Sequence, residues 1–316
     1  MRTYWRQRND LVQSAGRHIL RMQKALTQMN VQLANVLSDI SGVTGQAIIK
    51  AILAGERDPH KLAQLRDRRV KASQEQIARY LEGNWQEDLL FVLKQEQKAY
   101  EFCQQQIAEC DHQLAQYLQQ REDRSQGAPL PEEKRKGRLK KKRANKPQFD
   151  LRAELFRMTG TDLTRIDSID VMTAMTVLSE AGWDMSNWKT EDHFVSWLRL
   201  CPDNRISGNK VIGKGRLPTN NPITVALKMA ASTLRLSKTY LGAQFRRFRT
   251  RLGAPIAIKA MAAKLARLVY RMLRYGMKYV DQGEAFYELQ HRQLQLKQLK
   301  WKAAKLGFQI VQATAA

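Results

Sequence analysis

The chain has 316 residues, 43% of them hydrophobic, and its 54 Lys and Arg against 30 Asp and Glu give a net charge of +24. This hydrophobic content excludes a disordered tail, and no apolar run approaches the roughly 18 residues that cross a bilayer. Three cysteines at no metal-ligand spacing argue against a disulfide framework and a zinc site. We therefore expect a soluble protein of a reducing cytosol, without a membrane partner.

Residues 1–120 are expected to form a helical coiled-coil domain. One long helix is predicted over residues 9–37, because apolar residues recur there at alternating steps of four and three: Ala15, Ile19, Met22, Leu26, Met29, Leu33 and Val36. Shorter helices are expected after Asp58-Pro59 and through Gln76 to Leu81. A second long helix is predicted over residues 87–120. The two long helices can pair as a hairpin within one chain or as a seam between two chains.

Residues 121–148 predict a flexible basic linker, with 11 basic and 4 acidic residues and several Gly and Pro. A charge run of this kind is either simply solvated or binds RNA or DNA non-specifically through counterion release. The composition leaves both alternatives open.

Residues 149–316 predict a second compact helical domain. Helices are expected over residues 171–181, 191–200 and 241–252, from Pro222 onward, and after Gly253-Ala254-Pro255. The Gly- and Pro-rich stretch 201–221 is expected to be a loop, with one short strand near residues 211–212. The predicted fold class is mainly all-α.

A stretch without acidic residues points to a polyanion as the partner. Between Asn204 and Val280 there are seventeen Lys or Arg and no Asp or Glu. Near its start, Ser207-Gly208 forms a predicted turn that places a hydroxyl among basic residues, where it can lie against a phosphate. The alternative is an ordinary loop serine beside a solvated basic face.

Four sequence blocks in order carry a resemblance to a known family: Trp197–Lys210, Ala230–Leu234, Leu241–Arg247 and Lys264–Tyr270. They resemble the C-terminal domain of the insertion sequence one-hundred-ten family of bacterial transposases, which are bridge-RNA-guided recombinases. Residues 24–30 and 54–59 also look like the coiled-coil region of that family. The resemblance therefore covers nearly the whole chain.

The resemblance implies transposition of DNA through a phosphoserine intermediate, with Ser207 as the catalytic nucleophile. It implies DNA and a guide RNA as partners, self-association through the coiled coil, and a bacterial cytoplasmic protein associated with the nucleoid. Eight basic residues are the candidate nucleic-acid contacts: Arg205, Lys210, Lys214, Arg216, Arg246, Arg247, Lys264 and Arg267.

Members of the family also carry an N-terminal domain of the Holliday-junction resolvase fold with four acidic metal ligands. In this sequence Asp10 is the only acidic residue before Asp39, so those ligands cannot be assigned here. We expect no metal site in this chain, and Mg²⁺ only together with that domain. The chain is accordingly expected to be a fragment that is inactive by itself.

Two positions depart from the family pattern. Asn209 follows Ser207-Gly208 where the family has a second glycine, and Ile169-Asp170 replaces a glycine-containing turn of helix-hairpin-helix type. The Asp170 charge is expected to repel a phosphate there. The alternative function is a non-catalytic, dimerising helical protein that binds nucleic acid.

Overall fold

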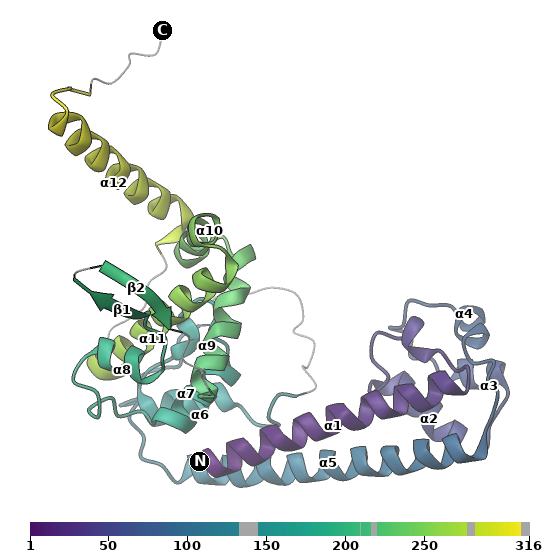
Figure 1. The fold of residues 1–316 in the computed structure, drawn as a ribbon. Coiled ribbons are helices and arrows are strands. Elements are labelled where there is room, and N and C mark those ends of the chain that lie inside the picture. Colours follow the sequence, from purple (N-terminus) through teal and green to yellow (C-terminus); the bar gives the residue numbers. More distant parts are fainter. Residues whose placement is uncertain (133–144, 209, 216–219, 277–281, 311–316) are drawn as a thin grey trace. The chain divides into compact units, whose positions relative to one another are not determined.

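The computed structural model describes residues 1–132, 145–208, 210–215, 220–276 and 282–310. These residues are mainly helical and include a pair of short antiparallel strands, which confirms the predicted fold class. The chain divides into two compact units (Figure 1). One comprises Met1–Gln116 and Pro147–Phe149, and the other comprises Tyr117–Lys146 and Asp150–Ala316. Residues 133–144 of the predicted basic linker lie outside the described residues.

Two long helices dominate the first unit. α1 (Arg2–Gln28) and α5 (Glu87–Gln119) lie side by side and run in opposite directions (Figure 1). Arg8 Nε donates to Asp111 Oδ1 at 2.5 Å near one end, and His18 Nδ1 lies 2.5 Å from Glu96 Oε2 further along. Of the two arrangements that the sequence left open, the structure therefore shows the hairpin within one chain.

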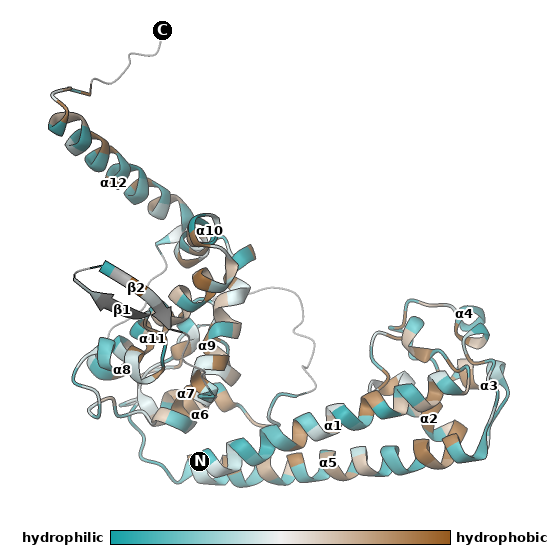
Figure 2. Ribbon diagram, viewed as in Figure 1, coloured by the Kyte–Doolittle hydropathy of each residue, from teal (hydrophilic) through white to brown (hydrophobic). Residues whose placement is uncertain are grey.

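The core of the first unit lies where short helices pack against α1 and α5. These are α2 (Val43–Leu53), α3 (Pro59–Gln64) and α4 (Gln74–Arg79), with a 3₁₀ turn η1 (Leu33–Asn35). Figure 2 shows hydrophobic residues gathered around α2 and the adjoining ends of α1 and α5. Eleven of the largest buried side chains there are Met22, Leu26, Met29, Leu33, Ile48, Ile49, Ile52, Leu62, Ile77, Leu81 and Leu93.

The helix predicted over residues 9–37 is wrong at both ends. α1 begins at Arg2. It ends at Gln28, because Asn30 adopts a left-handed φ of 62° and its side-chain amide donates to the Glu82 carbonyl. The apolar residues beyond it reach the core from a turn and a loop. The sequence pattern did not predict helix α2, because this helix contains Gly45 and glycine is unfavourable inside a helix. A Cβ at Gly45 would lie 2.2 Å from the Ile40 carbonyl oxygen, so this helix position requires glycine.

The second unit is built around α11 (Ala254–Tyr275), whose apolar face is fully enclosed. It packs against α8 (Glu191–Trp197), α9 (Pro222–Thr233) and α10 (Tyr240–Leu252). The buried side chains of this face are Met261, Ala262, Leu265, Ala266, Val269 and Tyr270. The opposite face carries the lysines and arginines, as its helical spacing predicts.

Several further elements complete the second unit. They are α6 (Leu151–Thr159), η2 (Leu163–Arg165), α7 (Val171–Ala181), β1 (Asp203–Ser207), β2 (Lys210–Gly215), η3 (Leu234–Leu236) and α12 (Gly283–Lys305). The predicted helix over residues 171–181, the helix start at Pro222 and the strand near residues 211–212 are confirmed. Helices α6 and α12 were missed, and α12 packs against α10.

Candidate functional site

The hairpin of β1 and β2 places Ser207 at its turn. Pro202 cannot continue a helix, and the chain crosses from one strand to the next through Gly208, whose φ is 53°. In the antiparallel register Ser207 pairs with Lys210, and both residues are exposed. The predicted Ser-Gly turn is thus a strand-to-strand turn that leaves a serine hydroxyl accessible with a lysine directly opposite.

The other basic residues predicted beside Ser207 are only partly described. The backbones of Arg205 and Lys214 lie in the two strands, where they pair with Gly213 and Asn204. Asn209 and Arg216 lie outside the described residues. The structure therefore brings Lys210 next to Ser207, and it puts Arg205 and Lys214 on the same two-stranded ribbon.

The candidate arginines on the helices are paired with carboxylates. Arg246 forms an ion pair with Glu284 and also donates to the Ser237 carbonyl at 2.6 Å, and Arg247 pairs with Glu288. Both carboxylates belong to α12. The fold thus supplies, from beyond the acid-free stretch, the negative charges that the stretch lacks.

Two carboxylates of α8, Glu191 and Asp192, form ion pairs with further arginines of the same acid-free stretch. Arg267 donates twice to Asp192 Oδ1, at 3.0 and 2.8 Å. Arg271 pairs with Glu191, including a contact of 2.6 Å from Nη2. Arg267 keeps 37% and Arg271 46% of its side chain exposed. These pairs are exposed enough for a stronger anion to compete with them.

Lys264 lies in a different environment from the other candidates. Its Nζ stands 5.3 Å from the centre of the Tyr240 ring. Burial lowers the pKa of Lys264, and the nearby charges of Arg271 and Arg267 lower it further. The lysine is half-buried and sits against an aromatic face, an arrangement in which the ring quadrupole partly replaces water around the cation.

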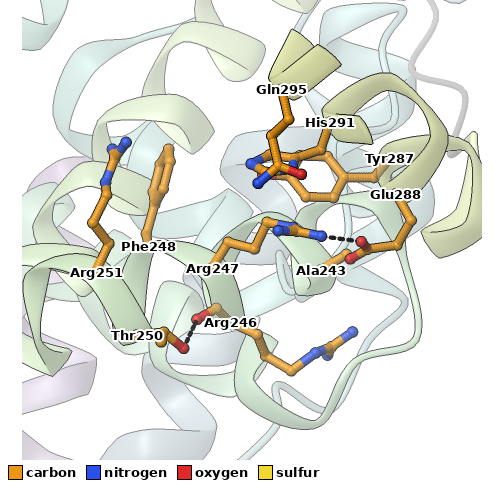
Figure 3. A pocket seen from close by; sticks show the side chains of 10 residues that line it. All are labelled: Ala243, Arg246, Arg247, Phe248, Thr250, Arg251, Tyr287, Glu288, His291 and Gln295. Atoms are coloured by element: carbon orange, nitrogen blue, oxygen red, sulfur yellow. Dashed lines mark hydrogen bonds and ion pairs between the residues drawn. The ribbon is translucent and has the colours of Figure 1, made fainter. Parts of the chain in front are cut away.

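A cavity that the sequence did not predict lies between α10 and α12. It has a volume of about 430 Å³, and Figure 3 shows the side chains around it. Ten residues line it: Ala243, Arg246, Arg247, Phe248, Thr250, Arg251, Tyr287, Glu288, His291 and Gln295. The signal in the sequence was the four arginines at 246, 247, 249 and 251, but their partners on α12 could not be recognised without that helix.

The turn before α7 offers no free helix terminus to an anion. Asp170 caps the helix, and its Oδ1 accepts from the backbone N–H and the hydroxyl of Thr173, both at 2.9 Å. Ser168 takes a left-handed φ of 72° in the same turn. A carboxylate thus occupies the place where a phosphate would need backbone donors.

Metal ligands do not gather in the part of the chain that the structure describes. No group of three or more His, Cys, Asp or Glu there could hold an ion. The described residues therefore do not fit a resident metal centre, and no chemical step is assigned to one. Within the same residues, no helix is long and apolar enough to cross a membrane.

The second unit is thus a mainly helical, basic domain with an exposed serine at a hairpin turn. Residues 160–247 match the model of the transposase IS116/IS110/IS902 family. The chain thus carries an insertion-sequence transposase domain of this family, which spans α7, α8, both strands, α9 and most of α10. No curated protein and no solved structure matches the chain.

Proposed function

We propose that this protein takes part in DNA transposition by strand exchange, with Ser207 as the nucleophile. One observation carries the proposal. Within the segment that matches the transposase family, Ser207 is exposed at a hairpin turn and is paired in register with Lys210. A nucleophile must be reachable by a bulky phosphodiester, and a turn projecting from a helical body meets that requirement.

The proposed reaction exchanges one ester bond for another. Ser207 Oγ attacks the phosphorus of a DNA phosphodiester, a bond from phosphorus to Oγ forms, and one of the two bonds from phosphorus to sugar oxygen breaks. The serine proton passes to a base, and the departing sugar oxygen takes up a proton. A hydroxyl of the partner strand then attacks the phosphoserine and releases Ser207.

Neighbouring cations stabilise the charge that builds up on the five-coordinate phosphorus. Lys210 is the described side chain best placed by register for this role, and Arg205 and Lys214 are its proposed companions on the two strands. A lysine or arginine neutralises charge but does not take the serine proton at neutral pH. The general base is therefore expected outside this set.

The test is covalent capture of labelled DNA. The chain is incubated with DNA and guide RNA, with and without a separately supplied acidic domain of the family and Mg²⁺, and adducts are resolved on denaturing gels. Ser207→Ala is expected to abolish the adduct. The control, Ser186→Ala, removes another exposed serine hydroxyl of the second unit and should leave the adduct intact. An adduct that survives Ser207→Ala would place the nucleophile elsewhere.

Binding of DNA and guide RNA is proposed to rest mainly on charge. When six or more phosphates are contacted, affinity should fall by about a thousandfold or more between roughly 50 and 200 mM salt. Ser207→Ala should leave this salt dependence unchanged, since a hydroxyl contributes little beside many ion pairs. Fluorescence anisotropy with a labelled oligonucleotide measures both, and a flat salt response would contradict the electrostatic basis.

The second candidate is a non-catalytic protein that binds nucleic acid and dimerises. It is favoured by the absence of a metal-ligand cluster among the described residues. The two candidates differ in the capture experiment. Salt-sensitive binding without any adduct, under every combination of added domain and metal, would support the non-catalytic function.

Self-association through the helical hairpin is proposed to use its outer face. The seam between α1 and α5 is filled within one chain, whereas Leu20, Phe91 and Phe102 are 65, 62 and 59% exposed. A second copy can cover these side chains. Phe91→Ser with Phe102→Ser is expected to lower the mass measured by analytical ultracentrifugation, and an unchanged mass would exclude this face.

A further inference from the structure

The cavity between α10 and α12 carries an excess of positive charge. Three arginines line it, Arg246, Arg247 and Arg251, against one carboxylate, Glu288. Glu284, which pairs with Arg246, reduces the local excess but does not cancel it. Figure 3 shows Arg251 and Phe248 at one side of the cavity and Arg247 with His291 at the other.

The walls of the cavity also hold hydrogen-bonding groups without partners. Arg247 Nε and His291 Nδ1 are buried, and neither has a hydrogen-bond partner among the described residues. A buried polar nitrogen that makes no hydrogen bond costs free energy, so such groups in a folded protein call for a ligand or a water molecule. Both belong to residues that face the same cavity.

The chemistry of these groups selects an anion with several acceptor oxygens. A guanidinium presents a planar set of donors that matches a phosphate, and Arg247 and Arg251 present two. The aromatic rings of Phe248 and Tyr287 add an apolar wall. A volume of about 430 Å³ holds a phosphate with its attached nucleoside, within the range of ligand pockets.

We propose that this cavity binds one phosphate group, from a nucleic-acid strand or from a free nucleotide, between Arg247, Arg251 and His291. The inference rests on the proposed function for the strand as the source of that phosphate. The site is built from α10 and α12, and so from other elements than the Ser207 hairpin. It gives α12 a role in holding nucleic acid.

Glu288 acts as a competitor in this site. Its carboxylate forms the ion pair with Arg247 that a phosphate oxygen would form, and 45% of its side chain is exposed. An exposed pair is weak and exchanges readily. Binding of a phosphate therefore requires the Arg247–Glu288 pair to open, and removal of the Glu288 charge should strengthen binding.

The experiment follows the Arg Nε–H signals of the whole ¹⁵N-labelled chain by NMR. The titrants are inorganic phosphate, thymidine 5′-monophosphate and an oligothymidylate. The Arg247 Nε–H signal is expected to move. Arg251→Gln should weaken binding about tenfold or more, since it removes a charge-assisted hydrogen bond. Arg251 is exposed, so the variant should fold normally. Glu288→Gln should bind more tightly than the unmodified chain.

Arg249→Gln is the matched control. Arg249 lies on the same exposed helix end and loses the same charge, but it does not line the cavity. It should weaken binding less than twofold. Equal losses for Arg249→Gln and Arg251→Gln, or no movement of the Arg247 signal with any titrant, would overturn the site.

The three titrants separate the sources of the phosphate. Tight binding of the oligothymidylate alone assigns the site to a strand, and equal binding of the mononucleotide assigns it to a free nucleotide. Neither measurement depends on strand exchange. A failure of the Ser207 capture experiment therefore leaves this result intact, and the reverse also holds.

Discussion

The ion pair of Arg8 and Asp111 in the first unit is buried, whereas the pairs that the arginines of α10 and α11 form in the second unit are partly open to solvent. Arg8 and Asp111 are 1 and 3% exposed between α1 and α5. Arg247 and Glu288 are 35 and 45% exposed, and Arg271 and Glu191 are 46 and 22% exposed. The same two kinds of side chain thus meet in two very different surroundings.

The surroundings decide what each pair can do. A buried pair cannot lose one partner without leaving a charge in a poorly solvated place, so it fixes the position of the two helices. An exposed pair contributes little to stability, and its arginine can exchange a carboxylate for another anion. We therefore infer that the buried pair of Arg8 and Asp111 holds the architecture, and we propose that the exposed arginines of α10 and α11 are available to bind polyanions.

Asp111→Ala tests the buried pair and should have the largest effect. We expect the first unit to lose about 3–5 kcal/mol of unfolding free energy, the usual cost of leaving one member of a buried ion pair. Hydrogen exchange of the α1 and α5 amides measures this loss. Glu109→Ala removes an exposed carboxylate from the same helix and is the control. Equal losses in the two variants would show that the pair with Arg8 does not hold the hairpin.

Glu96→Gln tests a pair of intermediate burial. Glu96 is 15% exposed and contacts both His18 and Arg21. Its substitution should cost about 1.5–3 kcal/mol, the range for hydrogen bonds to charged groups, measured by the same exchange of the α1 amides. A cost above that of Asp111→Ala would break the relation between burial and stability.

Local signals predicted much of the fold. The helix over residues 171–181 and the helix start at Pro222 follow from capping residues and proline, which act within a few positions of the chain. The helix over residues 9–37 failed where a tertiary contact intervened. Asn30 is held by the Glu82 carbonyl, 52 residues away, and no periodic pattern contains that information.

The same distinction applies to the candidate site. Gly208 and Pro202 made the turn at Ser207 predictable, because both act on the local backbone. The partners of the arginines were not predictable. Arg246 and Arg247 pair with residues 38 and 41 positions away. A stretch without acidic residues therefore describes the sequence correctly but overstates the free charge of the folded surface.

Glu191→Gln tests the exposed pairs and should have the smallest effect on stability. Glu191 contacts Arg271 and Arg267, both partly exposed, so the loss should stay below about 1 kcal/mol. Nucleic-acid affinity should rise instead, by about two- to fivefold, the factor that corresponds to roughly 0.5–1 kcal/mol. Anisotropy titrations at fixed salt measure the change.

Glu154→Gln separates this local effect from net charge. It removes the same charge from a comparable pair with Arg157, which are 21 and 25% exposed, in the same unit but outside the acid-free stretch. If charge at the arginines of α11 governs binding, Glu191→Gln strengthens it and Glu154→Gln does not. If both variants gain equally, only the total charge matters, and the exposed pairs of α11 lose the role that the comparison gives them.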